Sequence, residues 1–469
     1  MYRGKKGLRC RVCTGCGLCP GVTPESRAEG IRVLAEEGFG ESEALSGYPE
    51  ESSGKKPEAG ERALHFSGHR LVTADIGTTT VAMLLYGADG SVEDRFLALN
   101  PQRKYGADVI SRIRAAEDPE KAEEMCRRIR QVLAEGLERF RRKLGENETI
   151  FLTVAANTTM NYLLTGRDPA ELGRAPFHAS CFWEEQTEIE GAPCFRMPGL
   201  SAFLGGDVLA GMLACGMGER EEIQLLLDLG TNGELVLGNR ERRIACATAA
   251  GPAFEGGPAA GIWGADMVSL LAALRREGLL DETGLLAEPY FKDGVRVGNV
   301  LITQEAVRAV QLAKAAVAAG IEILLERYGI GPEQVDRVIL AGGLGYYLNP
   351  EDAALIGLLP AVWKEKAVAG GNTALAGALL AGRELLRAEA EEAGEQRSGS
   401  ALEVARGVRN GSESKGNRRS EDSRQRLAEC LRKLAEGTEC LNLAEEKDFG
   451  PRYIERMELK EFLFDSAKL

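Results

Sequence analysis

The sequence predicts an α/β protein built from two similar halves. From Leu71, short apolar runs joined by tight turns read as strands, and amphipathic helical stretches follow them. The plan then repeats, with strands in IQLLLDLG, ELVLG and RIACATA, a long helix in TQEAVRAVQLAKAAVAAGIEILLERYGI and a strand in DRVILAGG. In each half an Asp-Xaa-Gly-Thr motif separates the first two strands, so the halves are expected to share one topology.

Length and charge limit the class of protein. A chain of 469 residues is too long for one ordinary core. A net charge of -13 opposes a large nucleic-acid interface, because phosphates must be neutralised by Lys and Arg. No apolar run approaches the roughly 20 residues of a membrane-spanning helix, and no signal-peptide core is visible. We expect a cytoplasmic protein that binds neither nucleic acid nor membrane.

Composition divides the chain into six segments. We expect a Cys-rich head at 1–22, a linker at 23–68, one subdomain at 69–205, a second at 206–387, a disordered insertion at 388–423, and a C-terminal helix, strand and helix at 424–469 that dock on the body.

Both Asp-Xaa-Gly-Thr motifs predict phosphate-binding hairpins. Glycine lets the backbone turn tightly beside a phosphate, successive amides form an anion-binding nest, and Thr or Asn side chains add donors. The Asp at each strand end can hold Mg²⁺ through water or orient the attacking water. One copy alone could equally be an ordinary turn, but two copies in matching strand contexts favour a site. Its candidate catalytic residues are Asp75 and Asp228, and its candidate binding residues are Gly77, Thr78, Thr79, Gly230, Thr231 and Asn232.

A Gly-Gly turn after a later strand supplies a third element. Gly342 and Gly343 suit an adenosine site, because glycines let the backbone approach a base. The order hairpin, hairpin, Gly-Gly turn resembles the superfamily of sugar kinases, heat-shock chaperones and actin. This resemblance implies two ribonuclease-H-like subdomains of the actin-like ATPase fold, with ATP and Mg²⁺ between them. The sequence has neither a P-loop nor a Gly-x-Gly-x-x-Gly in the right strand context.

The head carries a cysteine run that predicts a metal site. Its members are Cys10, Cys13, Cys16 and Cys19, followed by Pro20. Three cysteines at this spacing can wrap one face of an iron–sulfur cube, as in bacterial ferredoxins. Zinc sites usually pair two C-x-x-C knuckles across a longer loop, and a redox disulfide is the remaining alternative. We expect an iron–sulfur cluster, of the 4Fe–4S type, whose fourth ligand is Cys19 or a residue from elsewhere.

Longer stretches carry a closer resemblance. They are DIGTTTVA, NPQRKYGADVISRI, NTTMNYLLTG, DLGTNGEL, CATAAGPAFEGG, ITQEAVRAVQLAKAAVAAGI and LAGGLGYYLNPEDAALIGLLP. Together they resemble the ATPase domain of the reductive activators of corrinoid proteins, over residues 71–382 and again near Thr438. The resemblance implies ATP-dependent reduction of a Co(II) corrinoid to Co(I), a corrinoid protein as partner, and a homodimer.

The head departs from this family. Members resembling this body carry a plant-type 2Fe–2S domain and an intervening domain ahead of the ATPase, or ferredoxin-like 4Fe–4S clusters at the other end. We expect neither here, only the four-cysteine head. Two arrangements stay open: a compact activator with its own cluster, or an ATPase that takes electrons from a separate low-potential ferredoxin.

Two rival functions share the fold. A small-molecule kinase would need a general base, for which Asp207 is the best candidate, although an Asp at a helix start is more often a cap. A nucleotide-switched binding protein would carry no iron. The turn at Asn157 could likewise be a helix cap or a ligand contact.

Overall fold

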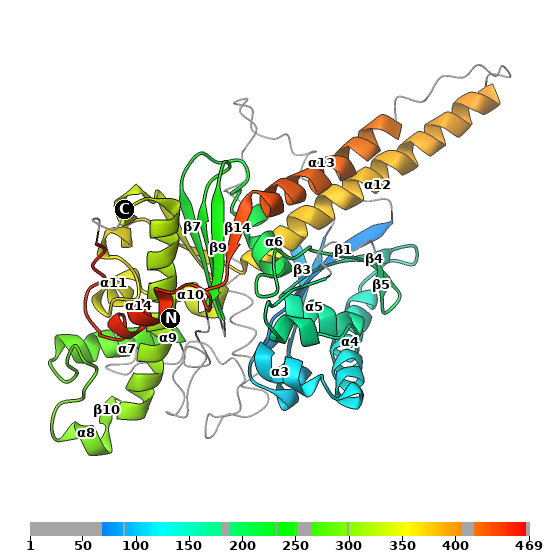
Figure 1. Ribbon diagram of the computed structural model, residues 1–469. Coiled ribbons are helices and arrows are strands. Elements are labelled where there is room, and N and C mark those ends of the chain that lie inside the picture. The colour runs from blue at the N-terminus through cyan, green and yellow to red at the C-terminus, as the bar shows by residue number, and fades with distance from the viewer. Residues whose placement is uncertain are drawn as a thin grey trace.

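Two six-stranded sheets form the frame of the protein (Figure 1). The computed structural model describes residues 68–465, apart from 88–89, 181–186, 231, 249, 251–263, 298–299 and 406–416. The cysteine head, and all of the predicted linker except its last residue, therefore lie outside the described residues. The α/β class predicted from the sequence is confirmed.

The first sheet has the strand order β3-β2-β1-β4-β6-β5. Strands β1, β2 and β3 are consecutive and antiparallel, whereas β4 lies parallel to β1 and β6 parallel to β4. The short β5 pairs with β6 at the edge. Their bounds are β1 His69–Ile76, β2 Thr80–Tyr86, β3 Val92–Leu99, β4 Thr149–Ala156, β5 Thr187–Ile189 and β6 Ala192–Arg196.

The second sheet has the order β13-β12-β7-β8-β9-β14. Strands β7, β8 and β9 are antiparallel, and β12 and β13 follow in parallel beside β7. Five strands of each sheet thus share one order, since β9-β8-β7-β12-β13 repeats β3-β2-β1-β4-β6. The two similar halves expected from the sequence are present. Their bounds are β7 Gln224–Leu229, β8 Gly233–Gly238, β9 Arg243–Thr248, β12 Arg337–Ala341, β13 Ala367–Gly371 and β14 Thr438–Leu441.

Two helices, α6 (Gly206–Ala214) and α12 (Thr373–Ala405), fill the space between the sheets. Their side chains share one core with residues from both sheets, including Leu71 of β1 and Leu226 of β7. The two helices cross very closely, because a Cβ on Gly377 would stand 1.9 Å from the carbonyl oxygen of Ala210. The contact between the halves therefore depends on small residues.

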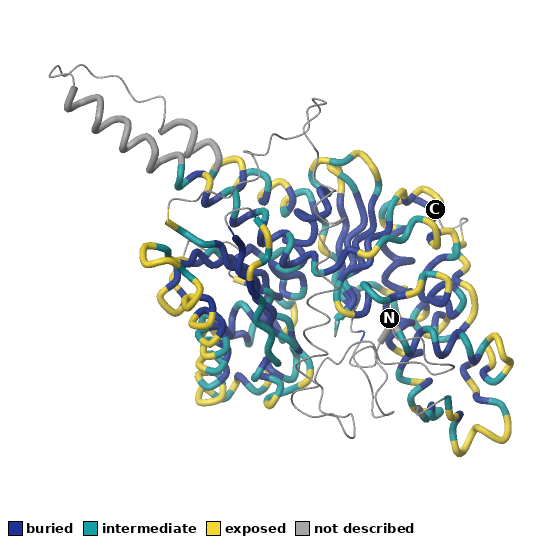
Figure 2. The backbone as a smooth tube through the Cα atoms, turned by 180° about the vertical axis from the view of Figure 1, so that it is seen from behind, coloured by how far each residue is buried: buried dark blue, intermediate teal, exposed yellow. Residues whose placement is uncertain are grey.

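The outer face of each sheet carries its own helices. Helices α4 and α5 cover the first sheet, and α7 and α9 cover the second, so the central strands of both sheets are largely buried (Figure 2). The edge strands β3, β5, β13 and β14 are more exposed. None of the helices in the described part of the chain is both long and apolar enough to cross a membrane. The remaining bounds are α3 Val109–Ala115, α4 Pro119–Arg141, α5 Thr158–Thr165, α7 Gly264–Arg276, α8 Tyr290–Asp293, β10 Val295–Val297, β11 Val300–Ile302, α9 Gln304–Tyr328, α10 Gly342–Gly345 and α11 Pro350–Leu355, with short 3-10 turns η1 Pro101–Tyr105, η2 Ala170–Gly173, η4 Pro332–Gln334 and η5 Ala361–Trp363.

The C-terminal segment packs on the second half. Strand β14 pairs in parallel with β9. Helix α14 (Phe449–Glu455) follows, and Arg452 donates to Glu326 of α9 at 2.5 Å. Just beyond α14, Arg456 donates to the buried Glu322 at 2.8 Å. These ion pairs join the end of the described chain to the 25-residue helix α9.

Residues 388–423 differ from the sequence prediction of a disordered insertion. Helix α12 continues to Ala405, and α13 (Asn417–Glu436) begins at Asn417, while residues 406–416 lie outside the described part. Figure 1 shows the two helices running side by side away from the sheets. The composition of this segment opposes a core, but its Ala, Glu and Arg residues favour helix locally.

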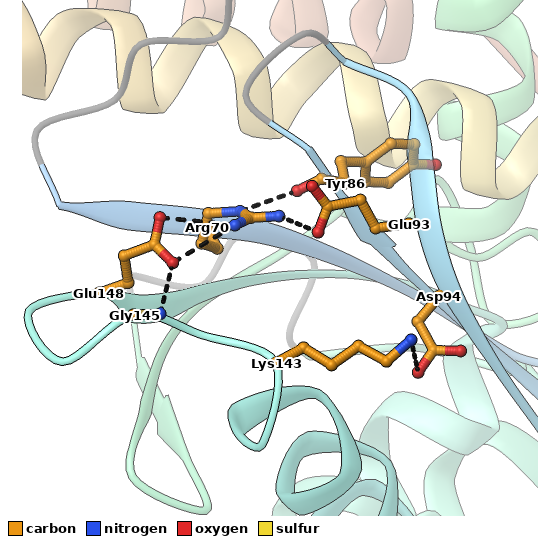
Figure 3. A network of polar contacts seen from close by, with 7 residues as sticks. All are labelled: Arg70, Tyr86, Glu93, Asp94, Lys143, Gly145 and Glu148. Atoms are coloured by element: carbon orange, nitrogen blue, oxygen red, sulfur yellow. Dashed lines mark hydrogen bonds and ion pairs between the residues drawn. The ribbon is translucent and has the colours of Figure 1, made fainter.

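Polar contacts fasten the end of β1 that lies away from Asp75 (Figure 3). Arg70 donates from Nε to the carbonyl oxygen of Tyr86 at 3.1 Å and from Nη1 to Glu148 at 3.3 Å, and it pairs with Glu93. One side chain therefore bridges β1, β2 and the turn that precedes β4, so this end of the strand is fixed.

Candidate functional site

The two Asp-Xaa-Gly-Thr motifs form matching turns in the two sheets. Asp75 and Asp228 are each the last residue but one of their strands, β1 and β7. In the first turn Gly77 donates its amide to the carbonyl oxygen of Thr80 at 2.9 Å, and in the second Gly230 donates to that of Asn232 at 2.9 Å. Both glycines thus close tight hairpins. Thr231 lies outside the described residues.

The first hairpin is held by side chains of three other segments, of which the sequence analysis named only Asn157. Asn100, just after β3, donates from Nδ2 to the carbonyl oxygen of Gly77 at 2.8 Å. The buried Arg112 of α3 donates to the carbonyl oxygen of Thr78 at 2.5 Å. Asn157 donates to Oγ1 of Thr78 at 3.3 Å. Asn157 also caps α5, which confirms the capping alternative for this turn.

The Gly-Gly turn lies against the second hairpin. Strand β12 ends at Ala341, which is in register with Asp228 of β7. Gly342 follows with φ +76, and a Cβ there would stand 2.4 Å from Oδ1 of Asp228 and 2.7 Å from the carbonyl oxygen of Leu229. A side chain does not fit at this position. A Cβ on Gly343 would meet nothing within 4 Å, so the space beside it is open.

The first hairpin is also joined to the second half by a hydrogen bond. Asn372, between β13 and α12, donates from Nδ2 to Oδ2 of Asp75 at 2.7 Å. Its Oδ1 accepts the amide of Leu375 at 2.8 Å, so the same side chain caps α12. Strand order brings this residue to the site, because β13, like β12, runs parallel to β7.

Four carboxyl groups with raised pKa values lie at this place, and burial is the largest cause for each of them. Burial raises the pKa of Asp75 to about 6, against a smaller lowering by the Asn372 hydrogen bond. Burial and then the charge of Asp75 raise the pKa of Asp207 to about 7 and that of Asp228 to about 7. Burial, followed by Asp207 and Asp228, raises the pKa of Glu234. Such a set favours a cation beside it.

Glu234 and Asp207 complete the acidic set from different elements. Glu234, on β8, is the register partner of Asp228, a pairing that the hairpin itself predicts but that the sequence analysis overlooked. Asp207 does not cap its helix, because Gly205 is the N-cap of α6, and its Oδ1 instead accepts the amide of Val208 at 2.8 Å. Its carboxyl group belongs with the other three.

The donor set is compatible with Mg²⁺ bound to a phosphate. Among the described residues, no group of three or more His, Cys, Asp and Glu side chains could hold a metal ion. Mg²⁺ usually keeps several waters and takes only one or two carboxylates together with substrate phosphates. Asp75 and Asp228 would supply those carboxylates. The predicted cluster ligands Cys10, Cys13, Cys16 and Cys19 lie outside the described residues.

Two family models match the chain in succession. The model described as the RACo middle region matches residues 71–220, and the model described as the C-terminal domain of RACo, the ASKHA domain, matches residues 222–260 and 257–405. Together they support the actin-like ATPase fold. The middle-region match covers the residues that carry the first sheet and its helices.

Individual relatives agree with the family models. The corrinoid activation enzyme RamQ of Eubacterium limosum is 32% identical over 66% of this chain and 63% of its own length. A reductase of Methanosarcina barkeri, named for a Co(II) methylated amine-specific corrinoid protein, is 25% identical over 38% of this chain and 42% of its own length. The chain thus matches less than two thirds of either relative.

A solved structure shows the same arrangement. The reductive activator for corrinoid, iron–sulfur protein superposes with a TM-score of 0.68 at 26% identity. The match covers 84% of this chain and 67% of that chain. It extends the similarity from the hairpin sequences to the placement of both sheets.

Proposed function

The chain belongs, over residues 71–405, to the family of reductive activators of corrinoid proteins, and on this premise we propose that it couples ATP hydrolysis to the reduction of a Co(II) corrinoid to Co(I). One electron is added to the cobalt, and a low-potential donor is oxidised by one electron. The partner is a corrinoid protein of a methyl-transfer system, whose Co(I) state accepts methyl groups. The reducing cytoplasm suits the thiolate ligands that we propose below.

The observation that carries this proposal is the meeting of three turns in one place. The hairpin of Asp75 and the hairpin of Asp228 come from equivalent strands, and Gly342 packs directly against Asp228. We propose that the hairpin amides and hydroxyls bind the phosphates of ATP, and that the Gly342-Gly343 turn faces the adenosine. Residues assigned to the phosphates are Gly77, Thr78, Thr79, Gly230, Thr231 and Asn232.

The four carboxyl groups would divide the remaining tasks. Asp75 and Asp228 would hold Mg²⁺, which would neutralise the charge that the phosphates bring. Asp207 and Glu234 lie beside them with raised pKa values, so each is a candidate to accept a proton from the attacking water. A kinase would instead present a substrate hydroxyl to Asp207, and the two readings differ in whether a phosphorylated product forms.

ATP is needed because the electron moves against a difference in reduction potential. Each 59 mV of opposing potential costs about 1.4 kcal/mol for one electron. Nucleotide can supply this only if it binds one state of the activator–corrinoid complex more tightly than the other. Asn372 reaches Asp75 from the far half, so a hydrogen bond between the halves ends on a carboxylate of the nucleotide site. A change at the phosphates can therefore alter how the halves are held.

We propose that the electron arrives through an iron–sulfur cluster on Cys10, Cys13, Cys16 and Cys19. A 4Fe–4S cluster supplies one electron at a time at low potential. A ferredoxin-like donor would return one electron to such a cluster after each transfer. A homodimer, implied by the family resemblance, would let a second subunit contribute the fourth ligand if Cys19 does not.

Anaerobic purification followed by iron and sulfide analysis tests the cluster. We expect iron and sulfide in equal amounts, and their loss when Cys10 and Cys13 are both replaced by serine. Absence of iron after anaerobic reconstitution would remove the resident cluster and leave a separate ferredoxin as donor. Phosphorylation of a small molecule, in place of corrinoid reduction, would favour the kinase.

A further inference from the structure

Residues 100–112, here called the bracket segment, form hydrogen bonds to one side of the turn of the first hairpin. Three successive carbonyl oxygens of the turn accept hydrogen bonds from it. Those of Gly77 and Thr79 accept from Asn100, through Nδ2 at 2.8 Å and the backbone amide at 2.9 Å. That of Thr78 accepts from Arg112 at 2.5 Å. The sequence stretch NPQRKYGADVISRI contains this segment, and the proposed function assigns it no role.

Because the peptide units are planar and trans, these hydrogen bonds also fix the direction of the backbone amides in the turn. In each trans peptide unit the N–H points opposite to the C=O. With the carbonyls of residues 77, 78 and 79 turned toward the bracket segment, the amides of residues 78, 79 and 80 point away from it. The amide of Thr78 has no acceptor among the described residues. Three successive amides facing one way form a nest that attracts an anion.

The side chain of Arg112 is held in a fixed position beside the first hairpin. It is completely buried. Nε donates to the carbonyl oxygen of Gly106 at 3.0 Å, and Nη1 contacts the sulfur of Met160 at 3.4 Å. Gly106 makes room for the close approach, since a Cβ there would stand 2.4 Å from Cβ of Ser111. The guanidinium is therefore fixed behind the hairpin, where its positive charge acts through protein and not through water.

We propose that Asn100 and Arg112 are positioning residues of the nucleotide site, which hold the first hairpin by its carbonyls so that its amides face a phosphate group. The proposal rests on the proposed binding of nucleotide but not on corrinoid reduction. The bracket segment would orient the amides of the nest, and Arg112 would also add a positive electrostatic potential there. Neither residue touches the nucleotide in this account.

Equilibrium binding of MgADP, with ATP hydrolysis measured alongside, tests the proposal on the full-length chain. Arg112→Met should weaken MgADP binding by about tenfold or more, the scale of a lost hydrogen bond to a charged group. Arg112→Lys keeps the charge without the fork of donors, and its binding should be intermediate. Asn100→Asp keeps the oxygen that accepts the amide of Gln102 at 3.0 Å but turns an acceptor toward Gly77, so it should also weaken binding.

Two controls separate positioning from folding. Arg139→Met removes a guanidinium of the same half that pairs with Asp94 at 2.6 Å, away from the hairpin, and should leave MgADP binding unchanged. Thermal unfolding of each variant shows whether it is folded. In folded variants kcat at saturating ATP should stay within about threefold of wild type, while KM rises, because Asp75 and Asp228 are intact.

The outcomes are distinct. Unchanged MgADP affinity in folded Arg112→Met and Asn100→Asp would overturn the positioning role, even if both variants melt at lower temperature. Should Arg112→Met not fold, Arg112→Lys and Asn100→Asp decide by the same readout. A wild-type protein that binds no nucleotide would instead overturn the proposed function, and this inference with it.

Discussion

Asn372 and Asp75 are separated by 297 residues in the chain, yet Nδ2 of Asn372 lies 2.7 Å from Oδ2 of Asp75. The same Asn372 caps α12, the helix that packs between the two sheets. A carboxyl group of the candidate phosphate site is therefore tied to the helix that connects the halves. This arrangement links the chemistry of the site to the relative position of the halves.

Replacing Asn372 by serine should separate its two roles. Serine can still cap α12, but it lacks the amide donor that reaches Asp75. Because that hydrogen bond lowers the pKa of Asp75, its loss should raise the pKa and shift the acid limb of the ATPase pH profile to higher pH. Asn372→Ala should show the same shift and lose about 1 kcal/mol of stability with the cap. If the acid limb of Asn372→Ser stays where it is in wild type, the hydrogen bond from Asn372 does not affect the pKa that controls ATPase activity.

The stability of the ligand-free protein should depend on pH through Asp228. Its folded pKa is raised from 3.8 to about 7, so its contribution to stability is full below the unfolded pKa and is lost as pH rises through the folded pKa. Asp228→Asn should therefore melt higher than wild type at about pH 8, with a smaller difference at about pH 5. Chelator must be present to exclude divalent cations. Equal differences at both pH values would contradict the raised pKa of Asp228, which burial and then the charge of Asp75 cause.

Gly342 and Gly343 form a matched pair for substitution. Gly342→Ala requires a Cβ 2.4 Å from Oδ1 of Asp228 at a φ of +76, so we expect a loss of about 1–3 kcal/mol in stability and a marked fall in ATPase activity. A Cβ on Gly343 meets nothing within 4 Å, and Gly343→Ala should fold normally, with any effect confined to nucleotide affinity. Denaturant unfolding and ATPase assays on both variants check this contrast, which equal losses of stability would refute.

The crossing of α6 and α12 should not tolerate a methyl group. A Cβ on Gly377 would lie 1.9 Å from the carbonyl oxygen of Ala210, so the helices must separate, at a cost of about 1–3 kcal/mol. Gly450, in α14, is the control. Its Cβ would meet nothing within 4 Å, and Gly450→Ala should be neutral or stabilise by about 0.5–1 kcal/mol. Chemical denaturation measures both, and a harmless Gly377→Ala would disprove the tight crossing.

The sequence predicted those features whose signals are local. The strand before each Asp-Xaa-Gly-Thr motif and the 25-residue helix α9 follow from periodic apolar residues, and both lie where they were expected. The repeated order of strands indicated two similar halves. Gly342 was named because glycine lets the backbone approach a base. Its close contact with Asp228, which leaves no room for a Cβ, is a property of the folded chain.

Residues brought in from distant segments escaped prediction. In the sequence, Asn372 can be identified only as the residue before a helix, and nothing local shows that it reaches Asp75. Arg112 reads as one of several arginines in an amphipathic stretch, although it is completely buried. Strand β13, with the sequence AVAGG, has too little apolar pattern to be distinguished from a loop.

The most direct test of the central claim is the rate of Co(I) formation on a corrinoid protein, with a low-potential donor in excess and with or without MgATP. Wild type should form Co(I) only when MgATP is present, and Asp75→Asn and Asp228→Asn, once shown to be folded, should be slower by about a hundredfold or more. Formation of Co(I) at the wild-type rate without ATP, or in either variant, would contradict this claim.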